Sequence, residues 1–325
     1  MNPKGVRGAI GKPPGKGLFM THIFIDGSAG TTGLRIRERL AERPDLSLIS
    51  LPEDLRKDPS ARRDALDAAD VAFLCLPDAA SVEAVSLVSS PDTVIIDTST
   101  AHRTAPGWTY GFPELTGMRE KIRTAKRVAN PGCHASGFIA LVFPLVAAGL
   151  LGKNARLSCF SLTGYSGGGK KMIAEYETPD RDPLYGAPRQ YGLTQVHKHL
   201  PEMAAVCGLD HPPVFCPVVA PYYAGMEVTV PLTPADTEAS PARIAEVYRD
   251  FYRTGLVRFA EGSENGFLSA GAMAGRDDME VSVFGNGERI LLVSRFDNLG
   301  KGASGAAIQN MNLALGLDEA TGLNA

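Results

Sequence analysis

Short apolar runs alternate with helical patterns in the first part of the chain. Residues 22–25 form a run rich in β-branched side chains, and residues 34–40 carry apolar side chains at their first, third and last positions with basic residues between them. Further apolar runs occupy residues 46–51, 70–76 and 93–97, and a helix is expected between the last two. Strands that alternate with helices indicate βαβ units, so the pattern predicts a parallel sheet.

The pattern changes after about residue 130, where strand-like runs alternate between apolar and polar positions and long connections join them. Such alternation is typical of strands with one buried face, and it predicts an α+β second domain on a mostly antiparallel or mixed sheet. The runs are residues 156–163, 214–219, 226–231 and 290–296. Residues 300–317 begin with glycines and continue as an alanine-rich helix.

The first 19 residues differ from the rest of the chain. They hold four basic residues and no acidic one, together with five glycines and three prolines. A segment of this composition cannot bury a core, so we expect a disordered extension. It also lacks the continuous apolar region that a secretory signal needs.

Composition excludes several classes of protein. The chain has 325 residues, which suggests about two domains. Hydrophobic residues make up 44% and charged residues 21%, as in ordinary globular proteins, which excludes a coiled-coil rod and wholesale disorder. Lys and Arg number 33 against 36 Asp and Glu, so no basic field exists to bind nucleic acid.

Cysteine and apolar patterning point to a cytoplasmic protein. The five cysteines are scattered and form no CxxC pair, so neither a structural metal site nor a disulfide framework is expected. The longest apolar stretch, residues 138–151, is too short for a bilayer and is interrupted by Pro144 and Gly149. We therefore expect no membrane partner and a reducing compartment.

A glycine loop separates the first predicted strand from the first predicted helix. In this position a glycine turn lets a pyrophosphate approach the backbone at a helix N-terminus, which favours dinucleotide binding over a turn without a ligand. The loop residues expected at the cofactor are Gly27, Ser28, Gly30, Thr31, Thr32 and Gly33.

The residues after the second predicted strand leave the type of dinucleotide open. Glu53 lies 20 residues after Gly33, where an acid can bind a ribose hydroxyl and favour NAD. Arg56 and Lys57 follow closely and can instead pair with a 2′-phosphate, which favours NADP.

Cys133 is the strongest candidate for a catalytic nucleophile. It follows Asn130-Pro131-Gly132 and precedes a strongly apolar helical run. A thiol at a helix N-terminus lies beside unpaired N–H groups and the positive end of the dipole, which predicts a lowered pKa. The alternative is a packed residue at the start of a helix. His134 is expected to be structural, because adjacency in sequence does not bring its ring to the sulfur.

His197 and His199 are two residues apart and share one side of an extended backbone. A histidine near its ordinary pKa is a natural partner for a thiol that must lose and regain a proton. The alternative is a pair of polar loop histidines. The sequence does not rank one of the two over the other.

Basic and polar residues in three segments are candidates for anion or cofactor contacts. Ser99 and Arg103 follow a strand end, where Arg103 can hold a carboxylate or phosphate bidentately. Lys170 and Lys171 close a glycine-rich segment that suits an anion site or, alternatively, a mobile loop. Asn298 opens the last helical segment, where its amide can contact a nicotinamide.

The order of these motifs resembles the N-acetyl-γ-glutamyl-phosphate reductases, in their shorter type 2 form, within the semialdehyde dehydrogenase superfamily. The resemblance rests on residues 26–34, 130–133, 197–202 and 297–302, and it covers about residues 20–317. The family usually has Tyr after the nucleophile, whereas this chain has His134.

The resemblance implies a Rossmann domain at residues 20–130, completed by a C-terminal helix at about 298–325. It implies a dehydrogenase-like second domain at 131–297 that carries catalysis and oligomerisation, and a homo-oligomer, either a dimer or a tetramer. It also implies NADP(H), which favours Arg56 and Lys57 over Glu53.

The activity implied is the reversible reduction of a small acyl-phosphate substrate to N-acetylglutamate 5-semialdehyde and phosphate through a thioester on Cys133. His197 or His199 would move the proton, and Ser99, Arg103, Asn130, Lys170 and Lys171 would hold the substrate or its phosphate. The alternatives are an enzyme like aspartate-semialdehyde dehydrogenase and a non-catalytic NADP-binding regulator.

Overall fold

A computed structural model describes residues 20–325, and the extension expected to be disordered lies outside the described residues. The first sheet has the strand order β2-β1-β3-β4-β6-β5, and every neighbouring pair is parallel. The predicted parallel sheet is therefore confirmed. Its strands are β1 (Thr21–Asp26), β2 (Leu46–Ile49), β3 (Val71–Leu74), β4 (Val94–Asp97), β5 (Thr109–Tyr110) and β6 (Arg127–Ala129).

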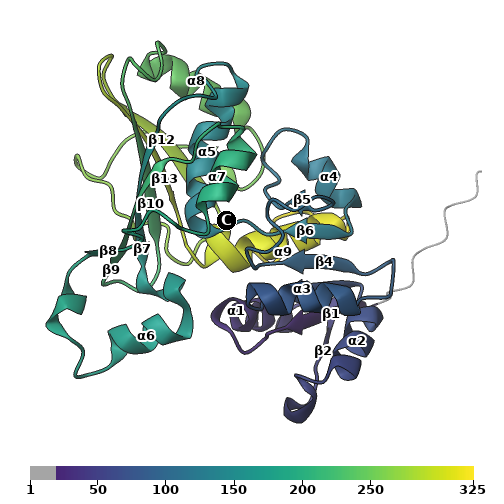
Figure 1. The fold of residues 1–325 in the computed structure, drawn as a ribbon. Helices are drawn as coiled ribbons and strands as arrows, with labels where there is room; N and C mark the ends of the chain where they lie inside the picture. The colour runs from purple at the N-terminus through teal and green to yellow at the C-terminus, as the bar shows by residue number, and fades with distance from the viewer. Residues whose placement is uncertain (1–19) are drawn as a thin grey trace, which may run out of the picture.

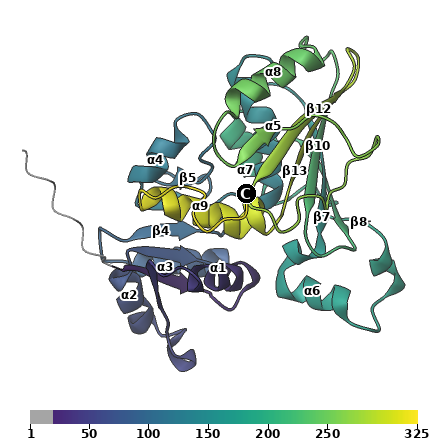
Figure 2. The same cartoon turned by 180° about the vertical axis from the view of Figure 1, so that it is seen from behind.

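Helices cover both faces of this sheet (Figure 1). One face packs against α1 (Thr31–Ala41), α4 (Met118–Thr124) and the C-terminal helix α9 (Gly305–Ala314), whose Ile308 and Met311 join the core formed by β1 and β3. The other face packs against α2 (Pro59–Ala68) and α3 (Asp78–Leu87). The end of the chain thus returns to the first domain, as Figure 2 shows from behind.

The second sheet has the order β11-β12-β13-β10-β7-β9-β8, and it is mixed, because β7–β9 and β11–β12 are parallel while the other pairs are antiparallel. This confirms the α+β second domain. Its strands are β7 (Ser158–Gly164), β8 (Arg189–Gln190), β9 (Val214–Ala220), β10 (Met226–Leu232), β11 (Val257–Phe259), β12 (Met279–Gly285) and β13 (Ile290–Phe296).

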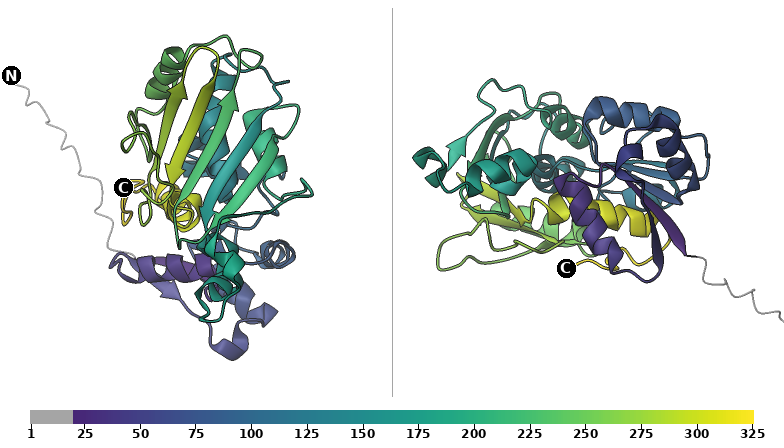
Figure 3. Two further views of the ribbon diagram at one scale, coloured as in Figure 1. Left: turned by 90° about the vertical axis from the view of Figure 1, so that its left-hand side faces the viewer. Right: turned by 90° about the horizontal axis from the view of Figure 1, so that it is seen from below.

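Three helices cover one face of the second sheet, namely α5 (Cys133–Ala147), α7 (Leu200–Cys207) and α8 (Pro241–Phe251). The left-hand view of Figure 3 looks onto the face that they leave open. Between β7 and β8 an arm extends toward α1, formed by the short turns η2 (Tyr165–Gly168) and η3 (Pro183–Gly186) and by α6 (Gly169–Glu177) (Figure 1).

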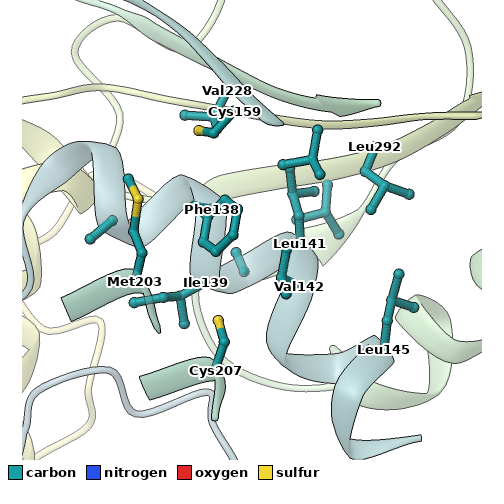
Figure 4. Packing of buried hydrophobic residues seen from close by; sticks show 14 of the residues in the cluster. Phe138, Ile139, Leu141, Val142, Leu145, Cys159, Met203, Cys207, Val228 and Leu292 are labelled. Atoms are coloured by element: carbon teal, nitrogen blue, oxygen red, sulfur yellow. The ribbon is translucent and has the colours of Figure 1, made fainter. Parts of the chain in front are cut away.

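Helix α5 is the centre of the second core. Phe138, Leu141 and Leu145 are fully buried, and Figure 4 shows them between side chains of α7 and of the sheet. The helix contains Pro144, which has no N–H to bond the carbonyl of Ala140. The hydroxyl of Tyr252 donates to that carbonyl at 2.7 Å, so the break in the ladder is satisfied from the neighbouring segment.

A buried ion pair lies where the two domains meet. The ammonium of Lys301 lies 2.7 and 2.8 Å from the carboxylate oxygens of Glu114, and Gln309 and the backbone N–H of Leu256 also donate to that carboxylate. Glu114 belongs to the first domain, Leu256 to the second, and Lys301 to the five-residue π-helical turn η4 (Gly300–Ser304) before α9. These contacts fix how the domains face each other.

Among residues 20–325, none of the helices combines the length and the apolar character that crossing a bilayer requires.

Candidate active site

The glycine loop forms the tight strand-to-helix turn that the sequence predicts. Gly27 has φ +87°, and a Cβ there would clash with the carbonyl of Cys75, the residue that follows β3. A Cβ on Gly33 would lie 2.5 Å from the carbonyl oxygen of Gly27. Glycine is therefore required at both positions for α1 to begin against β1 and β3.

The start of α1 is built to receive an anion. The amide of Leu34 donates to the carbonyl of Gly30 and is the first amide in α1 with a hydrogen bond inside the helix. The helix amides before Leu34 therefore have no helical partner. The hydroxyl oxygen of Thr31 is buried and has no partner among the described residues. Unpaired donors at a helix N-terminus fit a dinucleotide pyrophosphate.

A cavity of about 250 Å³ lies between the glycine loop and the carboxyl end of β2. Three basic side chains line it: Arg56 and Lys57, as predicted, and Arg37, which the sequence analysis did not single out. Glu53 does not line it, although it is part of the turn η1 (Glu53–Leu55) after β2. The carboxylate of Asp26 does line it but is paired with the buried guanidinium of Arg62 at 2.9 Å.

A second cavity, of about 380 Å³, lies where the two domains meet, and Cys133 and both predicted histidines line it. Thr31 and Thr32 of the glycine loop line the same cavity, so it borders the dinucleotide turn. The remaining predicted residues that line it are Arg103, Asn130 and Asn298.

Cys133 is the first residue of α5, and the turn before it brings the site together. The first amide of α5 with a bond in the helix is that of Ser136, which donates to Gly132, so the preceding amides are free of helical partners. A Cβ on Gly132 would clash with both the guanidinium of Arg103 and Nε2 of His199. Glycine at this position therefore lets both groups lie against the backbone that leads to the thiol.

Burial sets the protonation of the thiol. Burial raises the pKa of Cys133 above its ordinary value, and the amide of His134 and the charges of Arg103 and Lys198 offset this only in part. The sequence predicts the opposite sign from the helix N-terminus alone. The neutral thiol of the half-buried Cys133 is therefore favoured, and a base is needed to form the thiolate.

The histidines are neutral as well. Burial lowers the pKa of His199 well below its ordinary value, and the charge of Arg103 lowers it further. The pKa of the half-buried His197 is also lowered, first by burial and then by Lys198. Nδ1 of His197 accepts from the backbone N–H of His199 at 3.2 Å. Nε2 of His199 lies against Gly132, the residue before Cys133, and both imidazoles line the cavity.

Glu202 organises this site, and the sequence analysis did not identify it as a site residue. Its carboxylate is buried and accepts from the hydroxyl of Tyr110 at 2.7 Å, from the amide of Gly132 at 2.9 Å and from Arg103 at 3.0 Å. Its only local signal is an acid in the first turn of α7, three residues after His199. Arg103 also donates to the carbonyls of Thr98 and Asn130.

Three predicted anion ligands do not line the cavity. Ser99 is buried, and its hydroxyl donates to Asp97 at 2.7 Å. Lys170 and Lys171 are exposed on the first turn of α6, where Lys171 lies 3.9 Å from Glu175.

The two asparagines line the cavity, but their amides are bound by the protein. Asn298 accepts from the amide of Gly225 and donates to the hydroxyl of Ser166. Asn130 donates to the carbonyl of Ala303 and accepts from Asn310. Both side chains thus connect the loops that border the cavity. Among residues 20–325, no cluster of His, Cys, Asp and Glu has the geometry of a metal site.

A parallel-sheet nucleotide domain joined to a mixed-sheet domain with a thiol at the junction is the architecture of the semialdehyde dehydrogenases. Residues 49–125 match the family model "Semialdehyde dehydrogenase, NAD binding domain", and residues 133–298 match "Semialdehyde dehydrogenase, dimerisation domain". A crystal structure of aspartate semialdehyde dehydrogenase II from Vibrio cholerae has the same fold, with a TM-score of 0.69 at 18% identity over 91% of this chain and 98% of that one.

Close relatives narrow the family further. A protein of Brucella suis named N-acetyl-gamma-glutamyl-phosphate reductase is 50% identical over 307 residues, which cover 90% of this chain and 98% of the relative. N-acetyl-gamma-glutamyl-phosphate reductase 2 of a Nostoc species is 46% identical over 318 residues, or 93% of this chain and 98% of the relative. The chain belongs to the N-acetyl-gamma-glutamyl-phosphate reductase family, an oxidoreductase family with a nicotinamide-nucleotide domain.

Acid should destabilise the folded chain through its buried neutral histidines. Burial lowers the pKa of His134 from 6.5 to about 3, and that of His199 also lies well below 6.5. As the pH falls below 6.5, the unfolded chain binds protons that the folded chain does not, so stability is lost. We expect the free energy of unfolding in urea to fall by about 1.4 kcal/mol per pH unit for each of the two.

The variant His134→Gln should reduce the dependence of the free energy of unfolding on pH by the contribution of one histidine. The control variant His22→Gln, at an exposed position on β1, should leave this dependence unchanged. Equal slopes for the wild-type protein and His134→Gln between about pH 6.5 and pH 5 would show that His134 is charged in the folded protein.

Proposed function

We propose that the chain catalyses the NADPH-dependent, reversible reduction of N-acetyl-γ-glutamyl phosphate to N-acetylglutamate 5-semialdehyde and phosphate, in the biosynthesis of arginine. The observation that carries this proposal is the cavity that Cys133, His199 and the glycine loop line together. We assign cofactor binding to residues 20–130 with the segment from about 298, and substrate chemistry and self-association to 131–297. Because all five cysteines are free, we assign the enzyme to the cytoplasm.

The acylation step follows from the neutral thiol and imidazole. His199 accepts the proton of the Cys133 thiol as the sulfur attacks the carbonyl carbon of the acyl phosphate. The carbon–oxygen bond to phosphate then breaks, phosphate leaves, and the acyl group remains as a thioester on Cys133. The unpaired amides at the start of α5 stabilise the negative charge on the carbonyl oxygen. Arg103, held by Glu202, attracts the phosphoryl group.

Release of the aldehyde uses the same residues. NADPH, held by the glycine loop and the basic cavity beside it, would supply the hydride that reduces the thioester. His199, protonated in the first step, returns the proton to sulfur as the carbon–sulfur bond breaks, which frees the aldehyde and restores the thiol. Burial and the charge of Arg103 both disfavour a protonated His199, which makes the imidazolium a strong proton donor.

Removal of the thiol should abolish turnover. We expect Cys133→Ala to lower the phosphate-dependent oxidation of N-acetylglutamate 5-semialdehyde by NADP⁺ at least about 10³-fold, because no other group can form the thioester. NADPH formation at 340 nm measures the rate. Cys216→Ala, outside the cavity, should retain activity. Turnover by Cys133→Ala contradicts the mechanism, and turnover of aspartate semialdehyde alone by the wild type contradicts the substrate.

The basic cavity beside the glycine loop supports NADP(H) as the cofactor. Ser50, which is uncharged, follows β2 at the place where an acidic residue would bind the ribose diol of NAD. The cavity beside it is lined by Arg37, Arg56 and Lys57. Asp26, the carboxylate in the lining, is neutralised by Arg62. A 2′-phosphate pairs well with guanidinium and ammonium groups, whereas a ribose diol gains nothing from them.

Loss of two of these charges should change the cofactor preference. We expect Arg56→Ala/Lys57→Ala to raise the KM for NADPH at least about 10-fold, since each charged contact contributes about 1 kcal/mol or more, and to leave the KM for NADH nearly unchanged. Arg63→Ala, an exposed change on α2 outside the cavity, is the control. Equal increases for both cofactors would contradict the assignment of these residues to the 2′-phosphate.

The open face of the second sheet supports a homodimer, or a tetramer built from it. Phe160 is 50% exposed, Leu291 43% and Val214 59%, and the strand register places them on the same face. Helices cover only the opposite face, and large exposed apolar faces of this kind mark interfaces. A second copy of the same face can cover it about a twofold axis.

A charge on this face should separate the subunits. We expect the wild type to have at least twice the chain mass of 34.5 kDa by light scattering, and Phe160→Asp/Leu291→Asp to be largely monomeric. Val82→Asp, at an exposed site on α3 of the first domain, should keep the wild-type mass. A wild-type protein of 34.5 kDa, or an unchanged mass for the double variant, would contradict the interface.

A further inference from the structure

A row of three hydrogen-bonded side chains begins inside the second domain and ends at the cavity of Cys133. The hydroxyl of Ser161 on β7 lies 2.7 Å from Nδ1 of His134, and Nε2 of His134 lies 2.7 Å from the hydroxyl of Tyr191. Ser161 and His134 are buried, and Tyr191 lines the cavity. The mechanism above uses none of these three side chains.

In one of the two neutral tautomers of His134, the row leaves a hydroxyl donor available at the cavity. Burial lowers the pKa of His134 to about 3, so the ring is neutral and one nitrogen donates while the other accepts. When Nε2 carries the proton it donates to the oxygen of Tyr191, which leaves the hydroxyl hydrogen of Tyr191 for a ligand. Burial also raises the pKa of Tyr191, so that hydrogen is retained at working pH.

The backbone holds Tyr191 in this position. Its amide donates to the carbonyl of Pro217 on β9 at 3.0 Å. Four residues on, the amide side chain of Gln195 accepts from the N–H of Phe215 and donates to its carbonyl, and Gln195 keeps a left-handed φ of 55° to do so. The loop that carries Tyr191 and the two histidines is thus fastened to β9 at two points.

The thiol and the hydroxyl face one cavity from neighbouring positions. Cys133 and Tyr191 line the same cavity, and the charge of a Cys133 thiolate acts on the Tyr191 hydroxyl, which places the two groups near each other. His199 lies on another side of the row, with its ring centroid 5.5 Å from that of His134. An acyl group on the sulfur therefore lies within the cavity that the hydroxyl of Tyr191 lines.

We propose that Tyr191 is a further catalytic residue, whose hydroxyl donates a hydrogen bond to the carbonyl oxygen of the acyl group on Cys133 as that oxygen becomes negative. His134 and Ser161 are positioning residues that orient this hydroxyl. The proposal rests on the proposed function, because the acyl group on Cys133 is the group that Tyr191 contacts. No proton is transferred and no bond is broken by Tyr191, which supplies one donor in addition to the helix amides.

The first test is Tyr191→Phe, which keeps the ring and removes the hydroxyl. We expect kcat for the phosphate-dependent oxidation of N-acetylglutamate 5-semialdehyde to fall about 10²-fold, as for loss of one oxyanion donor. The KM values should change less than about 3-fold, and iodoacetamide should alkylate Cys133 at the wild-type rate, because the thiol and its base are untouched. Tyr165→Phe is the control, since its hydroxyl bonds Glu177 outside the cavity.

The second test separates orientation from structure. His134→Gln keeps a polar side chain beside Tyr191 and should lower kcat about 10-fold with little change in KM. Combined with Tyr191→Phe it should cause no further loss, because a residue that acts only through Tyr191 has nothing left to orient.

These measurements distinguish failure of the Tyr191 proposal from failure of the proposed function. The Tyr191 proposal is overturned if kcat for Tyr191→Phe lies within about 2-fold of that for Tyr165→Phe. It is also overturned if the losses in kcat add in the double variant His134→Gln/Tyr191→Phe. In both cases, turnover by the wild type still supports the proposed function. A wild type that folds but turns over no semialdehyde overturns both. Wild-type turnover with a selective loss of kcat in Tyr191→Phe supports both.

Discussion

The buried carboxylate of Glu202 is the constraint on which the rest of the site depends. It accepts hydrogen bonds from Tyr110 on the first sheet, from the amide of Gly132 and from Arg103. An unpaired buried carboxylate would cost several kcal/mol, so the fold must bring all three donors to it. Because Glu202 follows His199 on α7, the same contacts bring the imidazole to the turn that carries Cys133.

Burial shifts the pKa values of Cys133 and His199 in opposite directions. It raises the pKa of Cys133 and lowers that of His199, which favours the neutral form of both groups in the cavity that they line. The charge of Arg103 favours the thiolate, so at Cys133 it offsets part of the pKa increase caused by burial. The same charge disfavours the imidazolium, so at His199 it adds to the pKa decrease caused by burial. In the mechanism proposed above, the proton moves as the sulfur attacks the substrate carbonyl.

Local patterns in the sequence predict the parallel sheet, the glycine loop, and the meeting of Cys133 with the histidine pair, because helix starts and strand ends carry short-range signals. They do not predict Glu202, whose partners Arg103 and Tyr110 lie 99 and 92 residues away. Ser99 has the right chemistry for a ligand, but the neighbouring Asp97 takes its hydroxyl. The sign of the pKa shift at Cys133 follows from burial, which no local pattern reveals.

Omission of phosphate tests directly whether Cys133 carries the acyl group in this cavity. With NADP⁺ and N-acetylglutamate 5-semialdehyde but no phosphate, the thioester should form and persist. We expect a rapid burst of one NADPH per active site. Mass spectrometry should then find the added mass of the acyl group on the peptide that contains Cys133. Full steady-state turnover without phosphate, or an acyl group on another cysteine, would contradict it.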